Sequence, residues 1–217
     1  MNSPLQYGIR AVIISALLAS LSACGLLQFP GGGPAPNLYD LSPKNTFDED
    51  LPRIAKQLLV EEPSAARGLD SDRIALRPSP IEIKYFAGVR WADRAPRMVQ
   101  ILLVESFENT GRIVSVGRQS IGLRPDYSIK SDLREFQTEY FQDGQPKIHV
   151  RLNIKLVKMP EARIVASQTF DQIEPASGKD TTAIVQSFDE TLGKVMRQSA
   201  QWTLREISRI EAQTTRD

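Results

Sequence analysis

The sequence predicts an α/β fold, a mixed β-sheet with packed helices. Three patterns indicate this class: a helical segment between two strand patterns near the middle of the chain, a long alternating strand that begins at Lys147, and a helical apolar stripe towards the C-terminus. The 217 residues are 41% hydrophobic and 24% charged, which is typical of one globular domain or two small ones and excludes collagen, coiled coil and wholesale disorder.

The N-terminal segment predicts export. Arg10 precedes an apolar run from Ala11 to Ala23, which ends in small residues as a secretory signal peptide does. A membrane-spanning anchor is the less favoured alternative, because this run has 13 residues and a helix needs about 20 to cross the bilayer core. We therefore assign residues 1–23 to a signal peptide.

Cys24 is predicted to carry a lipid. The segment Leu21-Ser22-Ala23-Cys24 resembles the bacterial lipobox, in which the signal is cut before a cysteine whose thiol receives a diacylglycerol. The alternative, a small apolar residue inside a helix, fits poorly because residues 25–36 are rich in glycine and proline. We interpret residues 24–36 as a lipidated N-terminus and a tether that reaches about 40 Å when extended. Gly25 stands where an aspartate favours inner-membrane retention, so we expect a lipid anchor in the outer membrane, on its periplasmic face.

Charge and composition exclude several classes of function. The 27 basic residues are balanced by 26 acidic ones, so the chain lacks the basic surface that a nucleic acid requires. One cysteine cannot form an internal disulfide, and one histidine cannot build a zinc site of the usual nitrogen and sulfur type. We expect no metal and no cofactor apart from the covalent lipid on Cys24.

The folded domain is predicted to span residues 37–217. Its first two strands are expected at Leu38–Leu41 and Leu58–Val60. Between them lies the acidic run Asp48–Asp50, which we interpret as a solvated loop rather than a metal site, because no further ligands cluster around it. Two more strand segments are expected around Ile74–Leu76 and Ile81–Tyr85, with a break at the prolines between them.

A helix is expected to follow these strands. Pro96 suits a first helical turn and Gly111 suits a C-terminal stop. The apolar run Ile101–Val104 is also compatible with a buried strand, which we keep as the alternative. The apolar positions with helical spacing are Val99, Leu102, Leu103, Ser106 and Phe107. A strand at Ile113–Val116 comes next, and the order strand, helix, strand predicts two parallel strands joined by a right-handed crossover.

The clearest strand runs from Lys147 to Lys158, where apolar and polar residues alternate and the polar face is expected to meet water or a partner. A turn at Pro160 leads into Arg163–Phe170, which predicts an antiparallel hairpin. The preceding segment, Tyr127–Tyr140, changes from odd to even apolar positions, so we expect a bulge near Arg134 or Glu135 and pairing with the 147–158 strand.

The last element is predicted to be a helix that covers the sheet. Asp180 is placed as its N-cap, and its apolar stripe includes Trp202 as a core residue. The stripe consists of Ile184, Phe188, Leu192, Val195, Ser199 and Trp202.

No active site is predicted. His149 lies on the polar face of its strand, where a general base is conceivable, but no nucleophile motif accompanies it and we favour a surface histidine. The glutamates Glu61-Glu62 and Glu105 with Glu108 are interpreted as solvated side chains rather than paired catalytic carboxylates.

Arg90 and Trp91 are named as candidate partner contacts. A tryptophan beside an arginine, just before a helix, has the composition of an interaction hot spot. Packing of Trp91 against Val99 at the end of the sheet is the favoured alternative.

From Asn37 to about Ile207 the residues resemble the ABC-type transport auxiliary lipoprotein family (paraquat-inducible protein C-like). The resemblance depends on the order of several motifs after the lipobox, each weak alone. They are Leu38–Leu41, Arg73–Pro78, Tyr85 through Val89–Ala92, Asp126-Tyr127 leading to Arg134–Phe136, the strand from Ile148, and Ala183–Trp202.

The resemblance implies an α/β sandwich of the anticodon-binding-domain-like class. It also implies an accessory component of an ABC transporter of the mammalian-cell-entry (MCE) type, which moves phospholipids or other hydrophobic molecules, with an MCE protein as partner. The chain has no phosphate-binding loop of the Gly-x-x-x-x-Gly-Lys-Ser/Thr type, so nucleotide hydrolysis would belong to another subunit. Docking of the transporter to the membrane is the expected role. A lipid carrier or chaperone, a regulator of an envelope synthesis enzyme and a homo-oligomer are left open.

Overall fold

The computed structural model describes residues 35–118, 124–141 and 144–214. Within these residues the chain forms nine strands and two helices. The strands are β1 (Asn37–Tyr39), β2 (Ile54–Val60), β3 (Ser64–Ala65), β4 (Arg73–Ser79), β5 (Glu82–Trp91), β6 (Ile113–Gly117), β7 (Tyr127–Glu139), β8 (Lys147–Lys158) and β9 (Arg163–Pro175). The helices are α2 (Ala95–Asn109) and α3 (Thr181–Thr214). The predicted signal peptide, Cys24 and the tether up to residue 34 lie outside the described residues.

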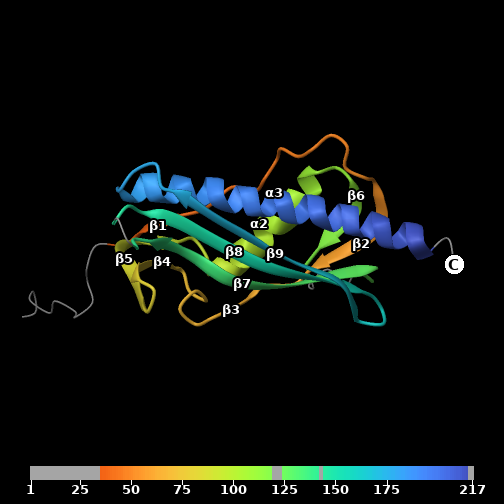
Figure 1. Cartoon of the computed structure of the whole chain (residues 1–217), viewed down its shortest axis with the longest axis horizontal. Helices are drawn as coiled ribbons and strands as arrows, with labels where there is room; N and C mark the ends of the chain where they lie inside the picture. The colour runs from red at the N-terminus through yellow and green to blue at the C-terminus, as the bar shows by residue number, and fades with distance from the viewer. Residues whose placement is uncertain (1–34, 119–123, 142–143, 215–217) are drawn as a thin grey trace, which may run out of the picture. The chain divides into compact units, whose positions relative to one another are not determined.

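Strand β7 organises the sheet, which is mixed and open (Figure 1). One edge of β7 pairs along its length with β8, antiparallel, and β8 pairs with β9 in the same way. The other edge pairs in parallel with three short strands in succession: β2 opposite Tyr127–Ile129, β3 opposite Asp132-Leu133 and β4 opposite Gln137–Glu139. Beyond them, β6 lies parallel to β2, β5 antiparallel to β4, and β1 parallel to β5.

The two helices contact each other, and α3 runs across β8 and β9 (Figure 1). Its start is fixed by Asp180, whose carboxylate accepts a hydrogen bond from the Ala183 amide at 3.1 Å, as an N-cap does. The predicted apolar stripe is buried apart from Trp202, which is half-buried and meets Phe170 edge to face at 5.8 Å. Neither described helix is both long and apolar enough to cross a membrane.

The core lies between the helices and the alternate residues of the strands that point towards them. On the three long strands, Leu133, Leu152 and Phe170 are opposite one another in register and are all buried. The neighbouring position on β7, Phe136, packs against Trp91 and Phe188 with ring centroids 5.6 and 5.1 Å apart. Every second residue of the strands is buried against the apolar stripe of α3, in which buried residues recur with the helical period of 3.6. This is the packing that the sequence pattern predicts.

Most predicted elements are confirmed, but the crossover is wrong. The helix after Pro96, the bulge between Leu133 and Glu135, and the hairpin of β8 and β9 are present. Strands β5 and β6, however, are not neighbours and run in opposite directions, because β5 is antiparallel to β4 while β4, β7, β2 and β6 are all parallel. The edges of β5 are taken by β1 and β4, so β6 pairs with the earlier strand β2 instead.

Candidate functional site

Charged and amide side chains gather on the face of the sheet opposite α3, where they alternate with the core residues of β7, β8 and β9. We call this face the open face. Strand pairing places Gln137 of β7 opposite His149 of β8, and His149 opposite Ile173 of β9. Glu135 and Glu139 lie two residues to either side of Gln137 and therefore share its face.

His149 is the centre of a buried hydrogen-bonded chain. Its Nδ1 lies 2.7 Å from Glu139 Oε1 and its Nε2 lies 2.8 Å from Asp171 Oδ1. The side chain is only 6% exposed, so the expectation of a surface histidine is wrong. The reason is the pairing of the strands, because a carboxylate from each of the two neighbouring strands covers one ring nitrogen.

A glutamine and two arginines complete this cluster. The Nε2 of Gln137 donates to Glu135 at 2.7 Å and to Glu139 at 2.9 Å, while its Oε1 accepts from the Phe136 amide. Arg77 Nη1 donates to Glu135 at 3.3 Å, and Arg151 Nε donates to Asp171 at 2.8 Å. We call Arg77, Glu135, Gln137, Glu139, His149, Arg151 and Asp171 the open-face cluster.

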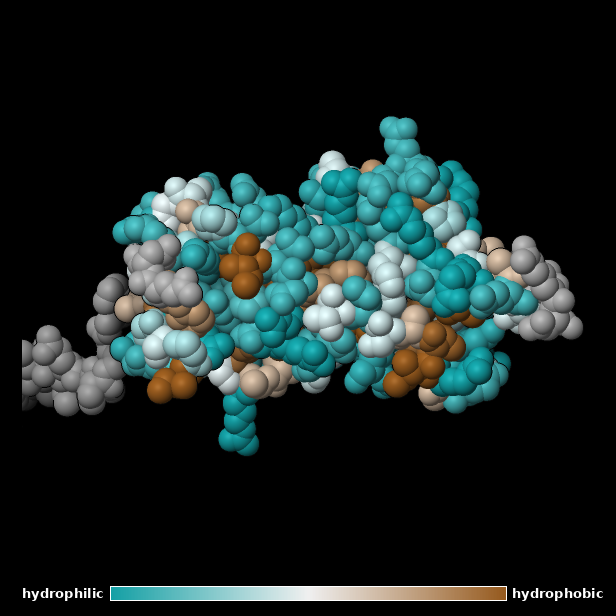
Figure 2. All heavy atoms as spheres, viewed as in Figure 1, coloured by the Kyte–Doolittle hydropathy of each residue, from teal (hydrophilic) through white to brown (hydrophobic). Residues whose placement is uncertain are grey.

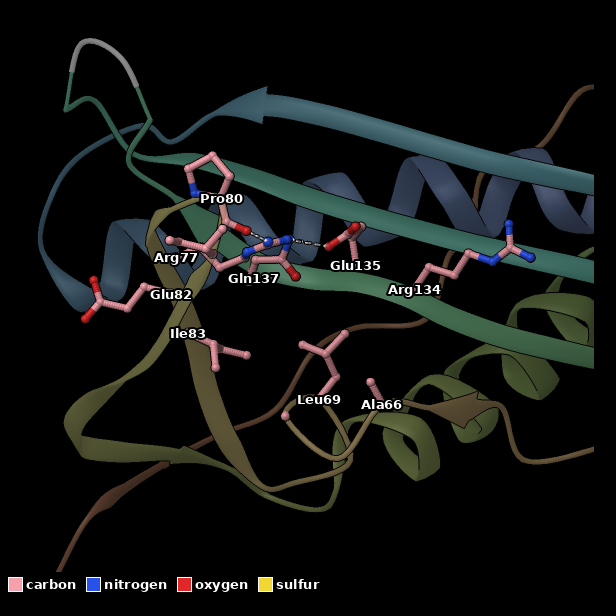
Figure 3. A pocket seen from close by; sticks show the side chains of 11 residues that line it. Ala66, Leu69, Arg77, Pro80, Glu82, Ile83, Arg134, Glu135 and Gln137 are labelled. Carbon is pink, nitrogen blue, oxygen red and sulfur yellow. Dashed lines mark hydrogen bonds and ion pairs between the residues drawn. The ribbon is translucent and has the colours of Figure 1, made fainter.

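A hollow of 310 Å³ borders this cluster (Figure 3). Arg77, Glu135 and Gln137 form its polar side, and Ile83 and Leu69 stand across from them. The remaining lining residues are Ala66, Gly68, Pro80, Ile81, Glu82 and Arg134. The loop of Gly68 is held against β5, since Tyr85 donates a hydrogen bond to the Gly68 carbonyl at 3.1 Å and a Cβ on Gly68 would come within 2.9 Å of Ile83.

The candidate partner contacts Arg90 and Trp91 are separated by the pleat of β5. Trp91 is 1% exposed and packs against Phe136 and Phe188, so its indole belongs to the core, as the favoured alternative predicted, and cannot itself contact a partner in this conformation. Arg90 is exposed and forms an ion pair with Asp72 at 2.8 Å. Only Arg90 presents its side chain at the surface.

The acidic loop is attached to α3 rather than fully solvated. Asp48 accepts hydrogen bonds from Arg197 at 2.7 Å and from Arg205 at 3.1 Å, whereas Asp50 remains 79% exposed. The hydrogen bonds from these two guanidinium groups lower the pKa of Asp48. The loop therefore connects the segment before β2 to the middle of the long helix.

A second polar group joins β7 to the end of α3. Tyr127 is buried and donates a hydrogen bond to Glu211 at 2.6 Å, and Lys56 of β2 pairs with the same glutamate at 3.0 Å. Burial, together with this hydrogen bond, raises the pKa of Tyr127. The lysine and tyrosine donors outweigh desolvation and lower the pKa of Glu211.

Glu61 and Glu62 have separate structural partners. Glu61 accepts from Ser128 at 2.7 Å and from Lys130 at 2.9 Å, and Glu62 pairs with Arg94. Glu105 and Glu108 border a hollow of 200 Å³ beside α2.

Exposed hydrophobic side chains are scattered. Figure 2 shows separate hydrophobic spots on a mostly hydrophilic face. Ile81, at the turn between β4 and β5, is 98% exposed, and its neighbour Ile83 is 43% exposed. The other large exposed hydrophobic residues are Leu38, Val114, Ile164 and Ile173. On the face that Figure 2 shows, the described residues do not form the large apolar patch that marks a permanent interface.

Sequence reasoning missed the partners of His149. The alternation placed His149 on the polar face, and the predicted pairing of Tyr127–Tyr140 with the 147–158 strand was correct. Only the register of the strands on both sides of His149 shows that Glu139 and Asp171 reach its imidazole ring. A glutamate and an aspartate on the same face of the two flanking strands were the available signal.

Comparisons with known proteins agree with this fold. The family described as "ABC-type transport auxiliary lipoprotein component" matches residues 39–206. The uncharacterized protein bll6063 of Bradyrhizobium diazoefficiens is 29% identical over 187 residues, which are 83% of this chain and 48% of that protein. This chain thus spans about half the length of that curated relative.

Two solved structures share the architecture. Protein XCC0632 from Xanthomonas campestris is 35% identical, with a TM-score of 0.77 over 81% of this chain and 99% of that one. Another crystal structure, of an uncharacterized protein, has a TM-score of 0.60 at 16% identity and covers 80% of this chain and 99% of its own. The second likeness concerns the fold alone.

Proposed function

Because the chain belongs to the family of ABC-type transport auxiliary lipoprotein components, we propose that it is a non-catalytic docking module of an MCE-type transport system for phospholipids or other hydrophobic molecules. The module binds the periplasmic part of an MCE protein. It is anchored in the outer membrane by a lipid on Cys24.

One observation favours a docking module over a lipid carrier. The space between sheet and helices is filled by side chains such as Leu152, Phe188 and Leu192, all 0% exposed, so the described interior is a packed core. Four hollows at the surface of the described residues measure 200 to 310 Å³. Pockets that enclose drug-sized ligands have about 300–1,000 Å³, and a phospholipid with two acyl chains is larger than such a ligand. The surface is therefore the part of this domain best suited to a function.

The tether supports the same proposal. Residues 25–36 extend about 40 Å at most, so a lipid at Cys24 leaves the domain free to stand off its membrane. When the partner is held in the opposite membrane, anchoring both proteins raises the effective concentration of each protein for the other. A weak and largely polar interface, as the scattered exposed hydrophobic residues indicate, is then sufficient.

Shortening the tether tests the proposal. Deletion of Phe29–Pro36 removes about 26 Å of maximum reach and is expected to impair the envelope barrier against detergents while leaving binding to the purified MCE partner intact. The matched control replaces the same eight residues by glycine and serine, which keeps the length and is expected to retain barrier function. Equal barrier function in all three proteins would contradict a role for the tether.

The binding experiment separates the open alternatives. The purified lipoprotein in detergent is mixed with the purified periplasmic part of the MCE protein, and complex formation is measured. Phospholipid that copurifies with the lipoprotein, without any MCE binding, would favour the carrier. Binding to a cell-wall synthase instead would favour the regulator.

A further inference from the structure

Three side chains of the open-face cluster bring potential metal-binding atoms close together. Atoms of Glu135, Glu139 and His149 that are able to bind a metal all lie within 4.8 Å of one another. Ligands at about 2.1 Å from a tetrahedral Zn²⁺ are roughly 3.4 Å apart, so the side chains need to move by only about 1–2 Å. We propose that these three residues bind Zn²⁺ through one nitrogen and two carboxylate oxygens, with a fourth position left for water.

The surroundings of His149 match those of a metal-ligating histidine. Such a histidine usually donates its second ring N–H to a carboxylate, which fixes the orientation of the ring. Here Asp171 holds Nε2 at 2.8 Å, and Arg151 in turn holds Asp171 at 2.8 Å. Nδ1 is thereby directed at Glu139 and the interior of the cluster.

The charge of the cluster favours a cation. Three carboxylates, Glu135, Glu139 and Asp171, lie together in this cluster beside two guanidinium groups, Arg77 and Arg151. The side chain of Glu139 is 11% exposed and that of Glu135 is 20% exposed, so water compensates these charges poorly. A divalent cation between the two glutamates would offset their charge where water does not.

The amide of Gln137 occupies the position between the two glutamates. Its Nε2 donates to both, at 2.7 and 2.9 Å, and is the group that Zn²⁺ would displace. Glu135 and Gln137 also line the 310 Å³ hollow, so the cluster borders this hollow on one side (Figure 3). A hollow that borders Glu135 and Gln137 leaves room for water beside the proposed ligands.

Zinc titration of the detergent-solubilised, full-length lipoprotein tests this proposal and does not depend on the transport role. Calorimetry and metal analysis are expected to give one Zn²⁺ per chain, with Mg²⁺ far weaker because imidazole is a poor ligand for it. The melting temperature is expected to rise by about 5–10 °C when free Zn²⁺ exceeds Kd roughly 100-fold.

Four variants make the test specific. Glu135→Gln and Glu139→Gln each remove a carboxylate ligand and are expected to weaken zinc binding at least about tenfold. Gln137→Ala removes the competing amide and is expected to tighten it about tenfold. The matched control, Glu174→Gln, changes a glutamate of β9 that pairs with Lys194 and is expected to bind zinc as the natural protein does. Circular dichroism confirms that each variant is folded.

Absence of zinc binding to the natural protein would overturn the proposal. Binding that is equally strong in folded Glu135→Gln and Glu139→Gln proteins would also overturn it, because the ion would then be held elsewhere. Unchanged or weaker affinity in folded Gln137→Ala would contradict the position assigned to the metal.

Discussion

Replacement of Leu152 by aspartate is expected to abolish cooperative folding. Leu152 is 0% exposed at the middle of β8, and its neighbours in register on β7 and β9, Leu133 and Phe170, are also buried. Loss of the leucine side chain alone costs about 2–5 kcal/mol, and a buried unpaired carboxylate adds several kcal/mol more. The sum approaches the total stability of a typical domain, about 5–15 kcal/mol.

Circular dichroism during heating and in urea measures this effect on the lipoprotein in detergent. Leu152→Ala gives a graded comparison and is expected to lower the melting temperature by about 4–20 °C. Lys155→Asp is the matched control, because it introduces the same carboxylate at an exposed position on the opposite face of the same strand. If Leu152→Asp melts like Lys155→Asp, the two faces of β8 have been assigned the wrong way round and the packing argument fails.

Three further predictions concern the anchor and two polar contacts. Cys24→Ser is expected to abolish labelling by a clickable fatty acid, because serine offers no thiol; undiminished labelling would reject Cys24 as the lipid site. The lowered pKa of Asp48 means that its ion pairs stabilise the fold above the unfolded value of 3.8 and lose this effect as the pH falls through the folded pKa. Asp48→Asn should therefore lower the urea midpoint at pH 7 and flatten its decline below about pH 4, whereas exposed Asp50→Asn should do neither. Tyr127→Phe removes the hydrogen bond to Glu211 and should cost about 1–2 kcal/mol in urea unfolding; an unchanged midpoint would contradict a structural role for that contact.

The elements that the sequence predicts well are those with a strong local pattern. Apolar and polar residues alternate strictly from Lys147 to Lys158, so the apolar residues form the buried face of the strand. The apolar positions of the preceding strand change from odd to even numbers near Glu135, which indicates a bulge. Asp180 could be placed as the N-cap because the apolar stripe of α3 begins directly after it. In these segments local preference and tertiary packing agree.

The order of the strands depends on contacts that no local pattern encodes. Strands β2, β3 and β4 share one edge of β7, and β3 consists of only Ser64 and Ala65, too short to produce a periodic signal. Since β1 and β4 occupy both edges of β5, the crossover expected after β5 has no free partner there. Helix α2 therefore leads to β6 at the opposite side of the sheet.

The candidate site was predictable only in part for the same reason. Alternation places His149 on the open face, but the carboxylates that bury it come from β7 and β9 and reach it through register alone. Arg90 and Trp91 together have the composition of an interaction hot spot. Because successive side chains of a strand point to opposite faces, however, Arg90 lies at the surface and the indole of Trp91 lies in the core. Which face a side chain takes decides its role, and that choice depends on the whole sheet.

The most direct test of the docking role is complex formation between the purified lipoprotein and the purified periplasmic part of an MCE protein from the same organism, measured together with the phospholipid content of each. We expect a saturable protein complex, a lipoprotein without stoichiometric phospholipid, and loss of barrier function when the tether is shortened. A lipoprotein that binds no MCE protein and takes up phospholipid by itself would contradict the docking role and establish the carrier.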